Sequence, residues 1–458
     1  MNKLDLKISY ACDLRCKFCV VASPDYIGSG IKPPTLSAEE LIAALKEGYL
    51  KGDRIVTFTG GEPTLFPYLP KLCRMAKLMG FKVIQIQTHG GKLMNERLAR
   101  ELIDAGANEF APSIHGAEAA THDYLTGIAG SHERTIAGVH TLKRLGQRVI
   151  MNTVVTSLNY KEMPRLAEMM VEWKVDQFQL AFLHIAGTAV HYKDWLVPRK
   201  AEAMPWVRRA LAIGHRHNLP CMTDGVPFCH MQGFEQCLAQ DIMPETFIQG
   251  ADGMTLDSYK TDRKDNQRAK GPGCKTCTFY NMCEGPWKEY PMQYGWDEFV
   301  PVHAVKIGDA APDFELLSDA GRKVKLSDSL GRQVILYFYP EDDSPGCTVE
   351  ACGFRDLVNA KASDAVILGV SPDSVDSHVR FKKKHALPFT LLSDPDHEGG
   401  LAYRVYMQGR GLERATFTIG ADGRVEKVFR QVEPNGHAQR VLELLRETRQ
   451  KLEAAVPS

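Results

Sequence analysis

The sequence lacks an excess of charge of either sign. Lysine and arginine together number 56, aspartate and glutamate also number 56, and the formal net charge is zero. This balance gives no support to a nucleic-acid partner or an anionic membrane partner. No apolar run approaches the roughly 20 residues that span a bilayer. The start, MNKLDLKISY, alternates polar and apolar residues and lacks the apolar core of a signal peptide. We therefore expect a cytoplasmic protein that binds neither membrane nor nucleic acid.

Cysteine, by contrast, is abundant and grouped. The chain has 12 cysteines among 458 residues, and structural disulfides are rare in the cytoplasm. Three cysteines lie in residues 11–20 (ACDLRCKFCV), three in 274–283 (CKTCTFYNMC) and two in 347–352 (CTVEAC). Cys73 stands alone in a helical pattern, and we expect it to pack in the core. The length allows two or three domains, and the cysteine groups indicate metal or redox chemistry.

Residues 4 to about 190 alternate strand and helix patterns. The expected strands are 4–10, 53–59, 82–88, 108–114, 148–155 and 176–183. Ser37 and Glu40 form a capping box at the start of one expected helix, and Gly106 and Gly146 end two others. Six β/α units with short links predict a parallel sheet, arranged as a doubly wound sheet or a partial barrel. In both, ligands bind at the carboxyl ends of the strands.

The remainder of the chain has two different characters. Residues from about 200 to 300 are rich in Cys, Gly and Pro with little periodicity, which predicts a segment that needs metal to fold. Residues 304–458 predict a second α/β domain. It has continuous apolar strands at 333–340 and 365–371 and a hairpin at 415–430.

The first cysteine group directly follows the first expected strand. Cys12, Cys16 and Cys19 have the spacing C-x3-C-x2-C, which leaves one thiol too few for a four-cysteine zinc site. This spacing resembles that of the radical S-adenosylmethionine (SAM) superfamily. The resemblance implies a [4Fe–4S] cluster whose fourth iron binds SAM, and reductive cleavage of SAM to a 5′-deoxyadenosyl radical. It also implies a flavodoxin- or ferredoxin-like electron donor. A zinc site with a distant fourth ligand, or three unrelated thiols, is the alternative.

Later segments resemble the SAM-binding motifs of the same superfamily. Residues 57–65 (TFTGGEPTL) match its amine-binding turn, and residues 87–91 (QTHGG) match its third-strand turn, with His89 where asparagine is usual. The SAM-binding residues implied by the resemblance are Gly60, Gly61, Glu62, Pro63, Ser113 and Asn152. Ser113 would face the ribose or carboxylate, and Asn152 would come from the fifth strand. Ordinary strand-end polarity is the alternative for these last two.

The second cysteine group resembles the start of a SPASM/twitch extension, which binds auxiliary iron–sulfur clusters. Residues 273–285 have the spacing C-x2-C-x5-C, but Trp287 stands where the full pattern has its next cysteine. The upstream half of the pattern is approached by Cys221, Gly233 and Cys237, with one residue fewer between the last two. We therefore expect one auxiliary [4Fe–4S] cluster. Its expected ligands are Cys274, Cys277, Cys283 and one of Cys229 or Cys237. A structural zinc ion on the same ligands is the alternative.

The third cysteine group lies in residues 337–356 (YFYPEDDSPGCTVEACGFRD), which resemble peroxiredoxins of the bacterioferritin-comigratory-protein type. The resemblance implies that Cys347 attacks a hydroperoxide and becomes sulfenic acid. Cys352 would resolve it, and a thioredoxin-like reductant would restore both thiols. The other implied site residues are Arg414, which steadies thiolate and peroxide, Ser344, in the hydroxyl position usually held by threonine, and Pro340, which shields the site. Two core cysteines in a thioredoxin-like fold are the alternative.

The spacing of Cys347 and Cys352 has a geometric consequence. Five helical residues rise by about 7.5 Å, whereas a disulfide needs Cα atoms within about 7 Å. We therefore expect a reduced form in which both cysteines lie on a helix, and an oxidised form in which that helix is locally unwound.

The whole chain is therefore expected to have three parts. These are a partial (β/α)6 TIM-like barrel at 1–200, a cysteine-rich metal-binding extension at 201–300 and a thioredoxin-like α/β peroxiredoxin domain at 304–458. The chain begins almost at the first strand, which disfavours a leader-peptide substrate. The radical substrate is not indicated. His115 and His184 are strand-end candidates for quenching its radical.

Three relations between the two activities are consistent with the sequence. The leading hypothesis is that the peroxidase protects the oxygen-sensitive cluster. Alternatively, Cys347 and Cys352 join the redox cycle of the radical reaction, or the fusion only couples expression. A different class also fits, namely a thiol peroxidase with a non-catalytic Fe–S or zinc-binding N-terminal module.

Overall fold

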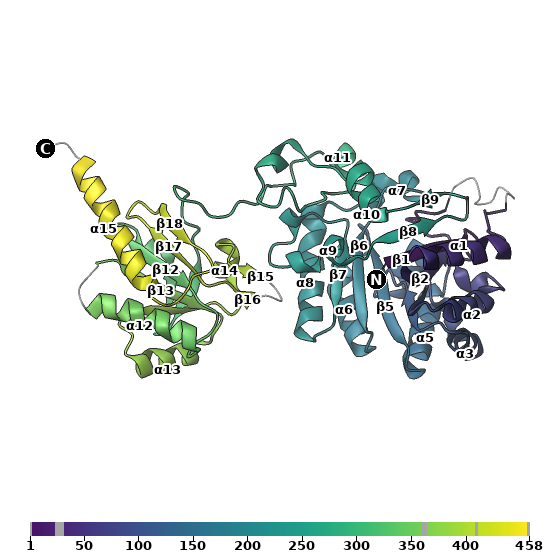
Figure 1. Ribbon diagram of the computed structural model, residues 1–458, viewed down its shortest axis with the longest axis horizontal. Coiled ribbons are helices and arrows are strands. Elements are labelled where there is room, and N and C mark those ends of the chain that lie inside the picture. The colour runs from purple at the N-terminus through teal and green to yellow at the C-terminus, as the bar shows by residue number, and fades with distance from the viewer. Residues whose placement is uncertain (1, 23–31, 360–363, 408–410, 456–458) are drawn as a thin grey trace. The chain divides into compact units, whose positions relative to one another are not determined.

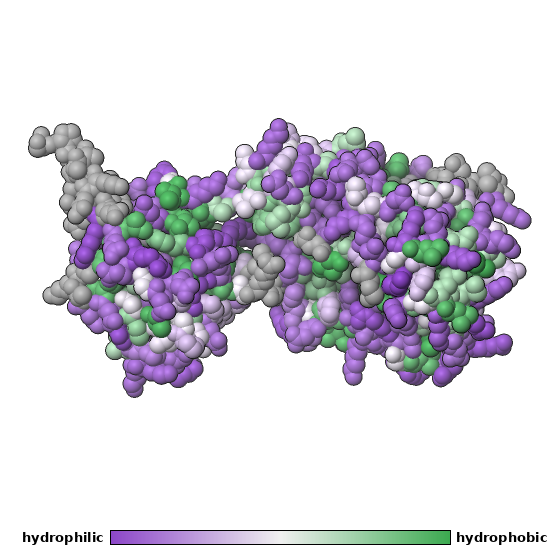
Figure 2. Space-filling view, in the orientation of Figure 1, coloured by the Kyte–Doolittle hydropathy of each residue, from purple (hydrophilic) through white to green (hydrophobic). Residues whose placement is uncertain are grey.

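A computed structural model describes most of the chain (Figure 1). The described residues are 2–22, 32–359, 364–407 and 411–455. The chain folds into two compact units, Met1–Val302 and His303–Ser458. Hydrophilic and hydrophobic side chains are interspersed over the visible face of both units (Figure 2). In these ranges no helix combines the length and the apolar character that a bilayer crossing requires.

The described strands of the first unit form one nine-stranded sheet in the order β7-β6-β5-β4-β3-β2-β1-β8-β9. They are β1 (Asn2–Ser9), β2 (Asp53–Gly60), β3 (Val83–Thr88), β4 (Glu109–Pro112), β5 (Arg148–Val155), β6 (Gln177–Phe182), β7 (Cys221–Asp224), β8 (Thr246–Gln249) and β9 (Thr255–Leu256). All neighbours pair in parallel except β9, which is antiparallel to β8. From β1 to β7 the order advances one strand at a time. This sheet therefore lacks the reversal of a doubly wound fold over that range.

The longer helices of this unit pack side by side along the sheet, and the shorter ones lie between its later strands. The helices are α1 (Ala38–Leu50), α2 (Leu69–Met79), α3 (Glu96–Ala105), α4 (Ala119–Thr126), α5 (Ser131–Arg144), α6 (Met163–Glu172), α7 (Ala189–Leu196), α8 (Lys200–Arg216), α9 (Ala239–Ile242), α10 (Tyr259–Asp262) and α11 (Glu289–Tyr294). Right-handed crossovers that keep one direction place their helices on one face. Accordingly α1 contacts α2, α2 contacts α3, α3 contacts α5 and α6 contacts α8 (Figure 1). The capping box of Ser37 and Glu40 is confirmed, as is the burial of Cys73 in the core.

The two faces of the sheet differ because the strands alternate. In β1, Leu4, Leu6 and Ile8 are fully buried in the core, and α1 packs against this strand. The alternate residues make a polar row in strict register across β1 to β5, formed by Asp5, Thr57, Gln85, Glu109 and Arg148. Hydrogen bonds join the last four of these side chains, at 2.6–2.8 Å. The sheet therefore has an apolar face and a polar face.

The cysteine-rich segment belongs to this same compact unit. Its β7 pairs with β6, and its β8 pairs with β1 on the far side of the sheet. The sequence predicted little regular structure in this segment, but the segment contains three strands. The strands contain only two to four residues, which is too short for alternation to show.

The second unit contains a seven-stranded mixed sheet in the order β11-β10-β14-β13-β12-β17-β18, together with the two-stranded ladder β15-β16. Its described strands are β10 (Glu315–Ser318), β11 (Lys323–Lys325), β12 (Val334–Phe338), β13 (Val366–Ser371), β14 (Thr390–Ser393), β15 (Tyr406–Met407), β16 (Gly411–Leu412), β17 (Ala415–Ile419) and β18 (Val425–Phe429). Its described helices are α12 (Pro345–Asn359), α13 (Val375–His385), α14 (Glu398–Ala402) and α15 (His437–Ala455). Every residue of β12 is buried, and β17 and β18 form the expected hairpin.

Candidate functional sites

The first cysteine triplet lies in the loop that follows β1. Cys12, Cys16 and Cys19 are free thiols. Burial raises the pKa of the Cys16 thiol well above its ordinary value, and the nearby thiols of Cys19 and Cys12 raise it further. Cys12 is exposed to solvent, whereas Cys16 and Cys19 are half-buried. Three neighbouring thiols on one short loop fit a soft metal or an iron–sulfur cluster, whose binding would release their protons.

Distant residues hold this loop in place. Thr188 follows β6, and its hydroxyl donates to the Cys16 carbonyl (2.9 Å) and accepts from the Cys19 amide (2.9 Å). A Cβ atom on Gly187 would lie 2.2 Å from the Cys19 carbonyl oxygen. The amides of Arg15 and Lys17 donate to carbonyls at the end of α4. Sequence reasoning missed Gly187 and Thr188, because no local pattern shows contacts between such distant segments.

The Gly-Gly-Glu-Pro turn after β2 lies directly on the end of β1. The Gly61 amide donates to the Ser9 carbonyl (2.7 Å), and the Glu62 amide donates to the Ala11 carbonyl (2.8 Å). A Cβ atom on Gly61 would lie 2.2 Å from the Ala11 oxygen, and one on Gly60 would lie 2.2 Å from the Ser9 oxygen. Both glycines are therefore required by close backbone approach. The turn is thereby fixed beside the cysteine loop.

The Glu62 carboxylate is buried and already has partners within the protein. It accepts hydrogen bonds from the Thr88 hydroxyl (2.6 Å), the His89 amide (2.8 Å) and the Thr64 amide (3.0 Å). These bonds tie the turn to the end of β3. The Thr64 hydroxyl also donates to this carboxylate (2.5 Å). Binding of an amine by Glu62, as expected of an amine-binding turn, would therefore compete with four internal donors. Pro63 is buried in the same turn.

His89 connects the end of β3 to the cysteine loop. Its Nδ1 accepts from the Gly91 amide (3.0 Å), so that Nε2 can donate to the Asp13 carboxylate (2.8 Å). Burial opposes ionisation of Asp13, but the nearby His89 holds the pKa of this carboxyl below its ordinary value. Histidine at this position thus makes a link to the triplet loop.

A cavity of about 310 Å³ opens beside the triplet loop. It is lined by Asp13, Leu14, His89, Gly91, Lys92, Met94, Asn95, Ile128, Ser131 and Arg134. Lys92 Nζ lies 3.6 Å from an Asp13 carboxylate oxygen. The volume is at the lower end of the range of small-molecule sites.

Ser113 and Asn152 lie side by side in the structure. They form a parallel bridge just beyond the end of β4, and the Ile114 amide donates to the Asn152 carbonyl (2.9 Å). His115, by contrast, is buried. Its Nδ1 accepts from the Val154 amide (3.2 Å), and its ring packs on Phe18. Burial holds the pKa of His115 well below its ordinary value. This histidine is a packing residue in the structure.

We expect Gly61→Ala to reduce SAM cleavage by roughly 100-fold, because displacing a positioning turn by about 1 Å misorients the reacting groups. The added methyl group would lie 2.2 Å from the Ala11 carbonyl. The measurement is the initial rate of SAM cleavage after anaerobic reconstitution. Gly146→Ala controls for a general loss of stability, because its positive φ of 69° makes the substitution strained although its Cβ atom has nothing within 4 Å. Equal rates in Gly61→Ala and the control would contradict the prediction.

The second cysteine group gathers around one upstream cysteine. Cys229 lies in the short helical turn Phe228–His230. Burial raises the pKa of Cys229 to about 12, and the adjacent thiols of the second triplet raise it as well. Those thiols are Cys283, Cys274 and Cys277. Backbone amides donate to two sulfurs, from Val302 to Cys277 (3.3 Å) and from Gly285 to Cys283 (3.3 Å). Such N–H···S bonds are also found around protein iron–sulfur clusters.

Of the two candidates for the fourth ligand, the structure groups only Cys229 with the second triplet. Cys237 lies instead beside His215 and Cys221. The sequence could not separate them, because both cysteines precede the triplet by similar distances along the chain.

Trp287, at the position of the missing cysteine, has a structural role. Its buried ring is stacked on His184 (4.0 Å between centroids), and the Arg268 guanidinium lies 3.5 Å from the ring centroid. The indole N–H donates to the Phe182 carbonyl (3.3 Å). His184 Nε2 also lies 3.3 Å from the Glu289 carboxylate. Trp287 cannot supply a thiolate, so this position offers no ligand for a second auxiliary cluster.

Lys200 was not indicated by the sequence. Its side chain is fully buried, with Nζ 3.2 Å from the ring centroid of Phe182 and 4.2 Å from that of Tyr290. Nζ has no hydrogen-bond partner in the part of the chain that the structure describes. Burial and the nearby Arg268 hold the pKa of Lys200 well below its ordinary value. An amine of this kind favours the neutral form and can accept a proton.

The candidate peroxidase site lies at the first turn of α12. Cys347 is buried, and Arg414 Nη2 donates to its sulfur at 3.1 Å. The same guanidinium forms an ion pair with the fully buried Glu350, one turn further along the helix. Burial raises the pKa of Glu350 to about 7, although Arg414 opposes this shift. Cys347 is therefore placed where both the helix N-terminus and a cation stabilise a thiolate.

The other predicted residues surround this turn. The Ser344 hydroxyl donates to the Glu341 carbonyl (3.3 Å), and Pro340 is exposed just after β12. Cys352 lies on the same continuous helix as Cys347, and both thiols are free. The structure thus has the helical arrangement expected of the reduced form. Glu350 was missed, because a glutamate inside a helix is ordinarily exposed.

The raised pKa of Glu350 makes the stability of the second unit depend on pH. Its folded pKa of about 7 exceeds the ordinary 4.5, so the folded state binds more protons between these values. The favourable contribution is complete below pH 4.5 and is lost as pH rises through 7. We expect wild type to lose about 2.5 kcal/mol of unfolding free energy between pH 5 and 8 relative to Glu350→Gln.

This prediction needs a probe of the second unit alone. All five tryptophans lie before residue 300, so tryptophan fluorescence does not report on α12. Amide hydrogen exchange of α12 peptides in the full chain measures the required free energy. The same pH slope in wild type and Glu350→Gln would show that Glu350 does not cause it.

Comparison with known families assigns a family to two parts of the chain. A family model described as the radical SAM superfamily matches residues 6–170, and one described as the AhpC/TSA family matches residues 307–428. Residues 6–170 therefore contain a radical SAM domain, and the chain belongs to the Bcp-type peroxiredoxins through its C-terminal part. The radical SAM and peroxiredoxin resemblances are confirmed, and the resemblance of residues 273–285 to a SPASM/twitch extension stays a prediction.

Particular relatives match the second part. The chain is 46% identical over 155 residues to peroxiredoxin Bcp of Bacillus subtilis, which covers 32% of this chain and 99% of the relative. It is 40% identical over 154 residues to peroxiredoxin Bcp of Escherichia coli, with coverage of 32% and 99%. A solved structure of peroxidoxin BcpB from Mycobacterium tuberculosis is 34% identical and covers 31% of this chain and 97% of that one, with a TM-score of 0.30.

Proposed function

We propose that this chain is a bifunctional enzyme in which a thiol peroxidase protects a radical SAM centre. The observation that carries the proposal is the presence, in one chain, of the anchored three-thiol loop and of the Cys347–Arg414 pair. We assign Cys12, Cys16 and Cys19 to a [4Fe–4S] cluster. When bound, this cluster supplies the electron that cleaves SAM to a 5′-deoxyadenosyl radical.

The chain's own groups give the N-terminal site its shape. The turn of Gly60, Gly61, Glu62 and Pro63 stands against the end of β1, beside the cysteine loop. Ser113, just beyond β4, and Asn152, within β5, offer polar groups from neighbouring strands. We interpret the sequential parallel sheet as the wall of a partial barrel, with this site at its carboxyl edge. The electron donor would be flavodoxin- or ferredoxin-like.

We assign the auxiliary cluster to Cys229, Cys274, Cys277 and Cys283. The grouping of their thiols supports this ligand set over one that contains Cys237. The proposed parts of the chain remain the radical SAM domain at 1–200, its cysteine-rich extension at 201–300 and the peroxiredoxin domain at 304–458. We retain the cytoplasm as the proposed compartment, because free cysteines of this number need a reducing environment.

In the peroxidase cycle, the Cys347 thiolate attacks one peroxide oxygen, the O–O bond breaks, and the other oxygen leaves as water or alcohol. Arg414 stabilises the thiolate through its N–H···S bond. Cys352 then attacks the sulfenic acid, water leaves, and a disulfide forms after local unwinding of α12. A thioredoxin-like dithiol reduces this disulfide.

A peroxide challenge tests the link between the two activities. Wild type and Cys347→Ser are reconstituted anaerobically, exposed to hydrogen peroxide with excess dithiol, and then assayed for SAM cleavage. We expect wild type to retain most of its activity and Cys347→Ser to lose it. Equal loss in both proteins would contradict protection.

A further inference from the structure

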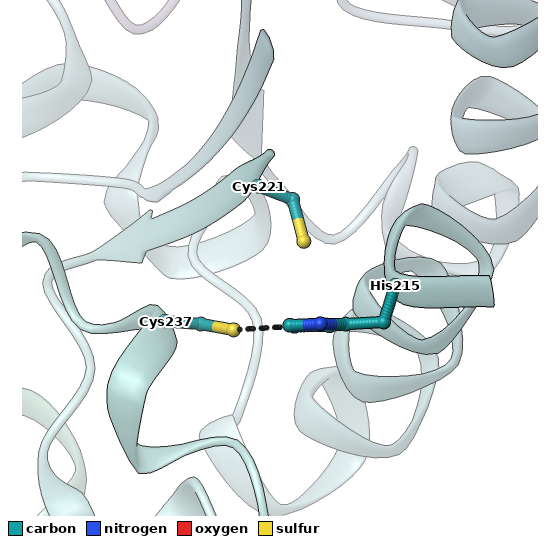
Figure 3. Close-up of side chains that lie close together, drawn as sticks. All are labelled: His215, Cys221 and Cys237. Carbon is teal, nitrogen blue, oxygen red and sulfur yellow. Dashed lines mark hydrogen bonds between the residues drawn. The ribbon is translucent and has the colours of Figure 1, made fainter. Parts of the chain in front are cut away.

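A third group of metal-ligand side chains lies apart from both cysteine triplets. His215 comes from the last turn of α8, Cys221 is the first residue of β7, and Cys237 ends the short helical turn Glu235–Cys237. Figure 3 shows the three side chains converging. Their ligand atoms all lie within 4.8 Å of one another, and His215 Nε2 is 3.1 Å from Cys237 Sγ. Both thiols are free.

The close spacing separates this group from the two triplets. Among the residues that the structure describes, it alone brings three His, Cys, Asp or Glu ligands so close together. A [4Fe–4S] cube holds its thiolates on different irons, which spaces the sulfurs more widely than ligands that share one ion. Two thiolates and one imidazole at this spacing fit a single soft ion.

We propose that His215, Cys221 and Cys237 bind one zinc ion. Zn–S bonds of about 2.3 Å and Zn–N bonds of about 2.0 Å in a tetrahedron place ligand atoms roughly 3.5 Å apart. The 3.1 Å between Nε2 and Sγ of Cys237 therefore opens by a few tenths of an ångström on binding. The fourth position of the tetrahedron belongs to water, and binding releases the thiol protons.

The residues around the proposed zinc site leave space for its ligands. A Cβ atom on Gly214 would lie 2.9 Å from the Cys221 sulfur and 2.9 Å from the Phe178 ring, so glycine is required beside this thiol. Cys237 is only 1% exposed, and the Phe234 ring lies 6.0 Å from that of His215. His215 and Cys221 are half-buried, which leaves the fourth ligand position accessible to water.

The zinc site also has a positioning consequence. Cys221 and Cys237 are the two ends of the segment that carries Cys229, and zinc would fix both ends to the end of α8. The ion therefore helps to present Cys229 to the second triplet. This role depends on the auxiliary cluster proposed above, whereas the zinc site itself does not.

The test is the metal content and zinc X-ray absorption of the full chain, purified anaerobically. We expect one zinc per wild-type chain and less than about a tenth of this in Cys237→Ser and His215→Gln. Cys73→Ser and Cys277→Ser are the matched controls and should keep the zinc. If Cys237→Ser instead loses about four iron atoms and no zinc, the cysteine belongs to a cluster and the proposal is wrong.

The zinc X-ray absorption spectrum of the wild-type chain tests the proposal even if the variants fold poorly. We expect two sulfur scatterers at about 2.3 Å and light scatterers at about 2.0 Å. Four sulfur scatterers, oxygen ligands alone or the absence of zinc would overturn the assignment. None of these readouts depends on SAM cleavage, so failure of the zinc site and failure of the proposed function are distinguishable.

Discussion

Cys347→Ser is expected to reduce the rate of hydroperoxide reduction by at least about a thousandfold, as loss of a nucleophile does in other enzymes. The serine hydroxyl is not ionised near neutral pH, so the Arg414 N–H that now meets the sulfur at 3.1 Å has no thiolate to stabilise. The measurement is hydrogen peroxide consumption by the full chain with thioredoxin and its reductase.

Cys352→Ser is the informative comparison for this result. It leaves Cys347 and Arg414 intact, so we expect one peroxide to be consumed per chain at the wild-type rate. Steady-state turnover should then stop, because no resolving thiol on α12 remains to form the disulfide. An equally slow first turnover in both serine variants would contradict the assignment of Cys347 as the attacking residue.

Cys16→Ala is expected to abolish SAM cleavage, with a fall of at least about a thousandfold, and to remove about four iron atoms per chain. Cys16 is one of three thiols that interact on the loop after β1, and two thiolates are too few to hold the cluster. The measurements are iron content and 5′-deoxyadenosine formation after anaerobic reconstitution.

Two variants control for non-specific damage to this unit. Cys73→Ala removes a thiol that is buried in the core and should leave the iron unchanged. Cys277→Ala should remove the auxiliary iron and leave the iron of the first triplet. Retention of all iron in Cys16→Ala would show that the first triplet holds no cluster.

The β/α repeats could be predicted closely from the sequence. The expected strand at 148–155 coincides with β5, and the expected hairpin at 415–430 contains β17 and β18. These strands are long enough to show alternation or continuous burial, and the helices between them end at glycines such as Gly106. Local physics therefore determines both their type and their limits.

The cysteine-rich segment could not be predicted in the same way. Its short strands β7 and β8 obtain their stability by pairing with β6 and β1, and local sequence does not carry that information. For the same reason, the local sequence could not show which of Cys229 and Cys237 lies beside the second triplet. His215 lies on a helix whose sequence shows only an amphipathic pattern, and its meeting with Cys237 depends on the tertiary fold.

Sequence motifs predicted the candidate sites, but they did not predict the residues that hold those sites in place. The spacing of Cys12, Cys16 and Cys19 identified the first site. Thr188, which holds the backbone of that loop, and Glu350, which shares Arg414 with Cys347, were both missed. Such residues act through single contacts between distant segments, so no hydrophobic periodicity in the sequence indicates them.

The most direct test of the account is the fate of SAM with the wild-type chain. The protein is reconstituted anaerobically with iron and sulfide, reduced with dithionite and mixed with SAM. The account predicts 5′-deoxyadenosine and methionine in equal amounts, with formation abolished in Cys16→Ala. A reconstituted wild-type chain that binds about four or more iron atoms yet forms no 5′-deoxyadenosine would contradict it, and would leave a thiol peroxidase joined to a non-catalytic metal-binding unit.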